Sequence, residues 1–125
     1  MRGRRLAFLL VGLAVTVAAC GGGGADEAPV GEAATEVTLV GEGIRFDVTQ
    51  LRVKAGEEVT ITFENRDSGV PHNLRIEGPE GPIKTDIANG PITQTLKLTI
   101  DRPGTYRFLC EVHPSSMVGQ LIAEG

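Results

Sequence analysis

The sequence predicts an all-β protein, built as an antiparallel β-sandwich of about seven to eight short strands. Apolar residues recur at every second position over much of the chain, which is the spacing of half-buried strands. Segments rich in glycine, proline and asparagine separate these stretches, and no segment has the apolar spacing of an amphipathic helix. An immunoglobulin-like module is the alternative, but it usually contains a buried tryptophan and two bridged cysteines, and this chain has neither.

Each strand is expected where apolar side chains alternate with polar ones. In chain order, Val37–Leu39 and Ile44–Val48 form the first one or two strands. They are followed by Leu51–Val53, Val59–Phe63, Leu74–Ile76, Leu96–Ile100, Tyr106–Cys110 and Val118–Ala123. Turns are expected between several of them, at Lys54–Glu57, Asn65–Gly69 and Asp101–Gly104. The segment Glu77–Gly90 is rich in glycine, proline and charge, so we expect a long irregular connection there, with a short helical turn near Lys84–Ala88.

The N-terminus has the features of a secretory signal, which we place at residues 1–19. Three arginines precede the apolar run Leu6–Ala19, and this run is shorter than the roughly 20 residues that a membrane-spanning helix needs. The segment Val17–Cys20 resembles the lipobox of bacterial lipoproteins, which implies that Cys20 becomes the first mature residue and carries lipid. The alternative is an ordinary signal peptide in which Cys20 has no role.

A flexible tether is expected at residues 20–34, because this glycine-rich segment has too few bulky apolar residues to order itself. The folded domain should then cover residues 35–125, which is near the lower size limit for a self-sufficient core. Small domains of this kind often depend on a disulfide or a metal ion. A lipidated Cys20 cannot form a disulfide with Cys110, so a metal ion is the remaining candidate.

The net charge of the whole chain is −4, and it becomes more negative once the arginines of residues 1–19 are removed. An acidic surface argues against binding nucleic acid, because phosphates demand a basic face. It allows electrostatic steering toward a basic protein partner. A surface that only keeps the protein in solution explains the same charge equally well.

The most specific feature of the chain is the run Cys110-Glu-Val-His113-Pro-Ser-Ser-Met117, which follows directly on an alternating strand. The only other histidine is His72. Two imidazoles, one thiolate and one thioether are the ligand set of a mononuclear blue-copper site. In such a site Cys110 provides the strong thiolate bond, His72 and His113 complete a trigonal plane, and Met117 is the weak axial ligand.

Three further residues are expected to support these ligands. Pro71 and Pro114 each lack a backbone donor and restrict the backbone beside a histidine, so both should stiffen the frame of the site. The side-chain amide of Asn73 can bridge to the loop that carries Cys110 and so tie the two ligand segments together.

Other kinds of site fit the same residues less well. Structural zinc usually has four cysteine or histidine ligands, and Met117 would add nothing to a zinc site. A binuclear copper centre needs a second cysteine on the loop, and a multicopper enzyme needs further histidines. With both histidines engaged, no base remains to activate a serine or cysteine nucleophile. We therefore expect one copper ion, cycling between Cu(II) and Cu(I), and no enzymatic activity.

The segment from about Thr35 to Gly125 resembles the cupredoxins, especially the small plastocyanin and amicyanin type. The residues that carry the resemblance are Asn65-x-Asp67, Pro71-His72-Asn73, Cys110-x-x-His113-x-x-x-Met117 and Val118-Gly119. The resemblance implies a Greek-key sandwich, one copper ion and outer-sphere electron transfer. It also implies that His113 is the partly exposed ligand through which electrons leave, surrounded by an apolar rim.

The candidates for this rim are Pro71, Pro114 and Val118. Two features depart from the family pattern. Glu111 follows the ligand cysteine, where the family often has a serine or threonine that partners the asparagine. Three residues separate His113 from Met117, which is intermediate between the amicyanin-type and plastocyanin-type loops.

The resemblance implies a protein that passes single electrons between redox partners outside the cytoplasm, such as a cytochrome or a membrane oxidoreductase. It implies no small-molecule substrate. Lipid at Cys20 would anchor the domain to a membrane, in the periplasm or at the cell surface, and raise its concentration near membrane-bound partners. Two other functions stay open at this stage: a copper-binding module for storage, delivery or resistance, and a structural surface domain with a vestigial site.

Overall fold

A computed structural model describes residues 32–125, so the expected signal sequence and Cys20 lie outside the described residues. The ten strands are β1 (Glu36–Gly41), β2 (Gln50–Lys54), β3 (Glu58–Asn65), β4 (Pro71–His72), β5 (Arg75–Gly78), β6 (Gly81–Lys84), β7 (Ala88–Asn89), β8 (Ile92–Thr99), β9 (Gly104–Leu109) and β10 (Val118–Glu124). Residues 32–125 contain no helix, so the described chain has no helix that could cross a membrane.

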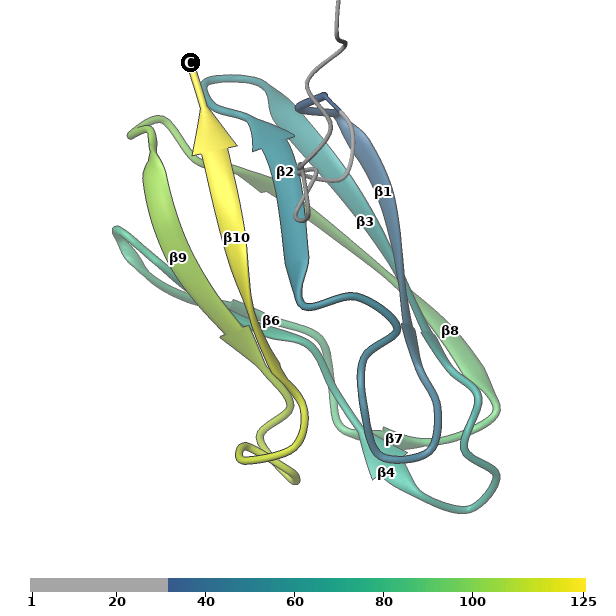
Figure 1. Ribbon diagram of the computed structural model, residues 1–125. Coiled ribbons are helices and arrows are strands. Elements are labelled where there is room, and N and C mark those ends of the chain that lie inside the picture. The colour runs from purple at the N-terminus through teal and green to yellow at the C-terminus, as the bar shows by residue number, and fades with distance from the viewer. Residues whose placement is uncertain (1–31) are drawn as a thin grey trace, which may run out of the picture.

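Eight of the strands form two facing sheets, as the sequence predicts, and β4 and β7 form a separate two-stranded sheet (Figure 1). One sheet has the order β1-β3-β8, and the other has the order β2-β10-β9-β5-β6. The chain passes repeatedly from one sheet to the other, which is the connectivity of a Greek-key sandwich. The pairs β1–β3 and β2–β10 are parallel, while the remaining strand pairs of both sheets are antiparallel. The all-β sandwich is therefore confirmed, with mixed strand directions.

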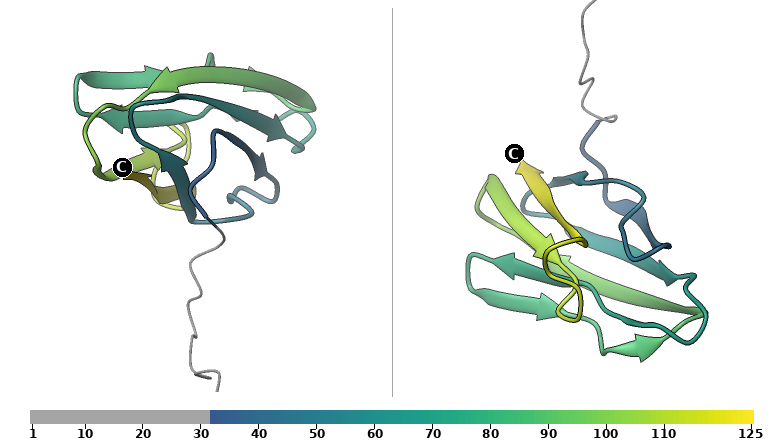
Figure 2. Two further views of the ribbon diagram at one scale, coloured as in Figure 1. Left: turned by 90° about the horizontal axis from the view of Figure 1, so that it is seen from above. Right: turned by 60° about the horizontal axis from the view of Figure 1, so that its bottom comes forward.

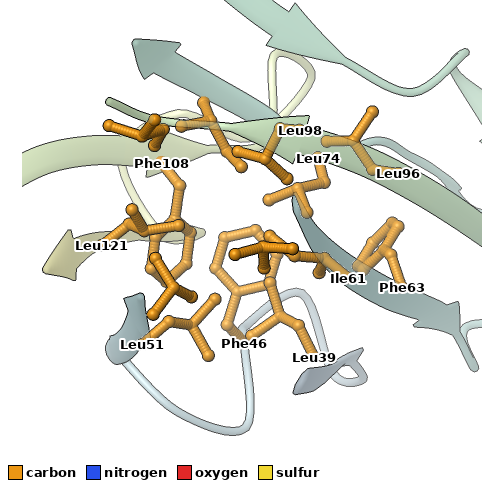
Figure 3. Packing of buried hydrophobic residues seen from close by; sticks show 14 of the residues in the cluster. Leu39, Phe46, Leu51, Ile61, Phe63, Leu74, Leu96, Leu98, Phe108 and Leu121 are labelled. Carbon is orange, nitrogen blue, oxygen red and sulfur yellow. The ribbon is translucent and has the colours of Figure 1, made fainter. Parts of the chain in front are cut away.

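The core lies between the two sheets and is formed by the apolar positions of the alternating strands (Figure 3). In β3, Val59, Ile61 and Phe63 are buried, while the threonines between them are partly exposed. The Phe46 ring packs edge-on against Phe63 and Phe108, with centroids 6.1 and 5.2 Å apart. Aromatic pairs in this arrangement contribute about 0.5–1.5 kcal/mol each beyond their buried area.

The prediction of a strand at Ile44–Val48 is wrong. These residues lie in the loop between β1 and β2, where Phe46 makes only an isolated bridge with Gly41. Phe46 is buried because the loop folds its ring into the core, whereas Ile44 is 41% exposed and has a positive φ of 55°. The alternating sequence therefore reflects a loop that packs Phe46, and in part Val48, against the core, and not a strand.

The prediction of an irregular connection at Glu77–Gly90 is also wrong, and the segment has no helical turn. It forms the hairpin β5–β6, in which Gly81, the first residue of β6, has a φ of 122°, and then the short strand β7. Strand β7 pairs with β4, so Ala88 lies opposite His72. This pairing attaches the segment to one of the predicted ligands.

Three segments meet at the end of the sandwich that lies away from the C-terminus. They are the β1–β2 loop, the β4–β7 pair and the loop between β9 and β10, and the views in Figure 1 and Figure 2 agree on this placement. All four predicted copper ligands lie on these segments or next to them.

Candidate metal centre

His72, Cys110 and His113 come together at this end of the sandwich. His72 ends β4, Cys110 follows β9 directly, and His113 lies on the loop after it. The Cys110 Sγ atom is 3.9 Å from the His72 Nδ1 atom and 3.9 Å from the His113 Nδ1 atom. The three donor atoms all lie within 4.8 Å of one another. Residues 38 positions apart in the sequence thus share one site.

The spacing of these donors fits a single metal ion. With bonds of about 2.0 Å to nitrogen and about 2.3 Å to sulfur, a trigonal arrangement separates nitrogen and sulfur by about 3.7 Å. The observed 3.9 Å is close to this value. One thiolate and two imidazoles form a soft donor set, which suits copper better than magnesium or calcium.

Backbone hydrogen bonds hold the loop from Cys110 to Met117 in a compact turn. The Cys110 N–H donates to the Met117 carbonyl over 3.0 Å, the His113 N–H donates to the Cys110 carbonyl over 3.2 Å, and the Met117 N–H donates to the His113 carbonyl over 2.9 Å. These bonds join the three loop residues of the predicted ligand set. Each therefore has a position set by the other two.

Met117 is fully buried, and its side chain lies against the end of β1. A Cβ atom added at Gly41 would be 3.1 Å from the Met117 Cε atom and 3.3 Å from the Phe63 ring. Glycine at position 41 is therefore the residue that leaves room for the thioether.

The two histidines differ in exposure. His72 and Cys110 are 0% exposed, whereas His113 is partly exposed. The imidazole rings of His72 and His113 lie 5.0 Å apart at an angle of 75°. The site thus has a buried side, with His72 and Cys110, and one partly exposed histidine, His113.

Asn73 makes the bridge that the sequence analysis expects, and its partner is Glu111. The Glu111 N–H donates to Asn73 Oδ1 over 2.9 Å, and Asn73 Nδ2 donates to Glu111 Oε2 over 2.9 Å. The second of these bonds replaces the serine or threonine contact that the family pattern suggests. The strand that carries His72 and the loop that carries Cys110 are thus joined by two hydrogen bonds.

Glu111 also accepts hydrogen bonds from two cations, which the sequence analysis missed. Arg75 Nη1 is 2.9 Å and Lys84 Nζ is 3.2 Å from Glu111 Oε1. The hydrogen bond from Arg75, followed by that from Lys84, lowers the pKa of the Glu111 carboxyl. Its negative charge therefore connects the Cys110 loop to the hairpin β5–β6. No local pattern in the sequence indicates this network, because its members come from three separate segments.

The role of Asp67 was also missed by sequence reasoning. His72 Nε2 donates to Asp67 Oδ2 over 2.7 Å, on the side of the ring that faces away from Cys110. The backbone N–H groups of Gly43 and Ile44 also donate to this carboxylate, over 2.7 and 3.0 Å. The hydrogen bond from His72 lowers the pKa of Asp67 to about 2, and the two amides act in the same direction. The Asn65-x-Asp67 motif was the available signal, but the motif by itself assigned no role to the carboxylate.

The two prolines occupy the expected places beside the histidines. Pro71 is partly buried and pairs with Asn89 across β4 and β7, while Pro114 is exposed. Their stiffening effect stays a prediction.

Comparisons with known proteins agree with this arrangement. Residues 7–123 match the family model for the cupredoxin-like domain. The chain is 30% identical to auracyanin-A of Chloroflexus aurantiacus, over 91% of this chain and 92% of that protein. It is 32% identical to amicyanin-alpha of Methylorubrum extorquens, over 99% of this chain and 100% of that protein.

Solved structures give the same result. Auracyanin A from Chloroflexus aurantiacus, described as a "blue" copper protein, superposes with a TM-score of 0.63 at 26% identity, over 75% of this chain and 100% of that one. Reduced auracyanin from Roseiflexus castenholzii superposes with a TM-score of 0.68, over 74% of this chain and 99% of that one, and its 24% identity supports the fold alone. The chain therefore belongs to the cupredoxin family.

Proposed function

We propose that this cupredoxin carries single electrons by means of one copper ion, held by His72, Cys110, His113 and Met117. The observation that carries the proposal is the convergence of one thiolate and two imidazole nitrogens within 4.8 Å at one end of a rigid sandwich. A bound copper ion supplies a one-electron couple between Cu(II) and Cu(I).

The role of the protein in this proposal is to keep the donor atoms still. Cu(I) and Cu(II) prefer different surroundings, so a fixed compromise geometry reduces the movement that accompanies electron transfer. The backbone bonds between Cys110, His113 and Met117 support such rigidity, as does the bridge from Asn73 to Glu111. Because Cys110 and His72 are fully buried, water has little access to the thiolate.

His113 is the proposed exit for the electron, because it is partly exposed whereas His72 is buried. Its neighbours Val112 and Pro114 are exposed, Val112 at 39%. Pro71 and Val118, the other expected rim residues, are partly buried. A redox partner with an apolar contact surface, such as a cytochrome or a membrane oxidoreductase, suits this end of the molecule. The proposal includes no small-molecule substrate, no nucleic acid and no catalytic residue.

The proposed location is outside the cytoplasm, with lipid on Cys20 as the anchor. The sequence of residues 1–20 supports this part of the proposal. A single acyl chain binds membranes weakly, so stable attachment requires more than one chain. Mass spectrometry of the protein from membranes, with Cys20→Ala as the control, tests whether Cys20 carries lipid.

Copper reconstitution of the purified protein tests the electron-carrier function. We expect an intense blue colour with one equivalent of Cu(II), reversibly bleached by a reductant, and a colourless protein for Cys110→Ser. A colourless Cu(I) complex that loses its metal readily to chelators would support copper storage or delivery instead. Failure to bind copper stoichiometrically would indicate a vestigial site.

A further inference from the structure

We propose that Asp67 is a positioning residue for the copper site: its carboxylate orients the His72 ring with Nδ1 toward the metal and lowers the reduction potential. This inference rests on the proposed function, because it assigns a role beside the same ligand. It concerns a residue that lies outside the predicted ligand set and is hydrogen-bonded to one of its members, His72.

The geometry decides which nitrogen of His72 can bind the metal. A neutral imidazole carries one N–H, and an ionised carboxylate only accepts hydrogen bonds. Asp67 Oδ2 lies 2.7 Å from His72 Nε2, so the proton belongs on Nε2. The lone pair is then left on Nδ1, the atom that is 3.9 Å from the Cys110 sulfur. His72 is 0% exposed, so water does not compete for Nε2.

The carboxylate itself is held in place by the backbone of a different segment. The N–H groups of Gly43 and Ile44 donate to its two oxygens, and the Asp67 N–H donates to Asn65 Oδ1 over 2.9 Å. Gly43 and Ile44, which lie in the β1–β2 loop, both have a positive φ, of 65° and 55°. This region is unfavourable for a β-branched residue such as isoleucine. A strained backbone of this kind persists where the surroundings hold it, and such strain concentrates at functional sites.

The charge on Asp67 should favour the oxidised metal. A carboxylate that accepts the second N–H of a ligating histidine raises the basicity of the ligand. Cu(II) carries one more positive charge than Cu(I), so it gains more from the stronger donor. Within residues 32–125, the hydrogen bond from His72 to Asp67 is the only one between a histidine of the site and a carboxylate. His113 makes no such hydrogen bond in this part of the chain. The effect therefore acts through the buried histidine.

The test is the reduction potential of the copper-loaded full-length protein carrying Asp67→Asn. Loss of the group that accepts a hydrogen bond from a metal-binding histidine typically lowers the metal affinity about 10–100-fold. We expect about a tenfold loss of Cu(II) affinity relative to Cu(I), which raises the potential by about 59 mV. The variant should stay blue, because all four proposed ligands remain.

The matched control is Asp47→Asn, which removes the same charge. Asp47 Oδ1 also accepts a backbone N–H, from Val40 over 2.9 Å, but it contacts none of the predicted ligands. A rise in potential with Asp67→Asn that clearly exceeds that of the control supports the inference. Equal shifts in the two variants, or no shift with Asp67→Asn, would overturn it.

A second measurement uses the unaltered protein and does not depend on whether a variant folds. In the diamagnetic Cu(I) form, nitrogen-detected NMR should show a slowly exchanging proton on His72 Nε2. A proton that exchanges as fast as that of an exposed imidazole, or its absence, would refute the inference. A colourless Cu(II)-treated wild-type protein would instead refute the proposed function, so the two failures are distinguishable.

Discussion

Gly41→Ala is the change that most directly tests the place of Met117 in the site. Gly41 ends β1 and is buried, and a Cβ atom there would lie 3.1 Å from the Met117 Cε atom and 3.3 Å from the Phe63 Cε2 atom. Carbon atoms pack most favourably at about 3.5–4.0 Å. The Met117 thioether end and the Phe63 ring must therefore move by a few tenths of an ångström to make room for the new methyl group.

The magnitude follows from two opposing terms. Extra volume in a well-packed core costs about 1–3 kcal/mol. Replacing glycine by alanine returns about 0.4–1 kcal/mol, because the unfolded chain has fewer conformations to lose. We therefore expect Gly41→Ala to lower the free energy of unfolding of the copper-free protein by about 1–2 kcal/mol. Copper-free protein is the correct form, since a bound metal adds its own stabilisation.

The assay combines urea unfolding with the visible spectrum of the copper-loaded variant. We expect the blue colour to persist, because Cys110 and the two histidines are untouched, and the spectrum and potential to shift with the position of Met117. Gly78→Ala is the control, since its Cβ would meet the Gly81 carbonyl oxygen at the same 3.1 Å on the distant hairpin β5–β6. If Gly41→Ala left both stability and spectrum unchanged, or if Gly78→Ala shifted the spectrum equally, the placement of Met117 would be wrong.

Three further substitutions have defined outcomes. Cys110→Ser should abolish the blue colour, because the thiolate bond is lost, and a variant as blue as the parent would contradict the assignment of the cysteine. Met117→Leu should keep the colour and raise the potential, because loss of a weak donor destabilises Cu(II) more than Cu(I); cyclic voltammetry measures this, and an unchanged or lower potential would argue against a thioether ligand. Asn73→Ala should lower the free energy of unfolding by about 1–3 kcal/mol, because the Glu111 N–H loses its acceptor. Urea unfolding of the copper-free protein measures this last effect, and no change would mean that water replaces the amide.

The strands and most of the donor residues could be predicted because their signals are local. Tyr106–Cys110 alternates in sequence, and Cys110, His113 and Met117 stand within eight residues of one another. The same local rule failed at Ile44–Val48, because alternation cannot distinguish a paired strand from a loop that inserts one ring, Phe46, into the core.

A different limit applies to Glu77–Gly90. The segment is polar and contains several turn residues, so its sequence has the composition of an irregular connection. It forms the edge hairpin β5–β6 because β5 has a partner in β9, which is remote in the sequence. The available partner, rather than the composition, decides whether such a segment becomes a strand.

The sequence by itself determined the all-β class, the scarce sulfur and imidazole donors, and the short loop that carries three of them. Only the tertiary structure decided that His72 lies beside Cys110, that Asp67 binds the far side of the His72 ring, and that Glu111 replaces the expected partner of Asn73. The physical reason is that periodicity and donor chemistry belong to neighbouring residues. A hydrogen bond between residues far apart in the chain depends on which strands lie next to each other, and that follows from the packing of the whole sandwich.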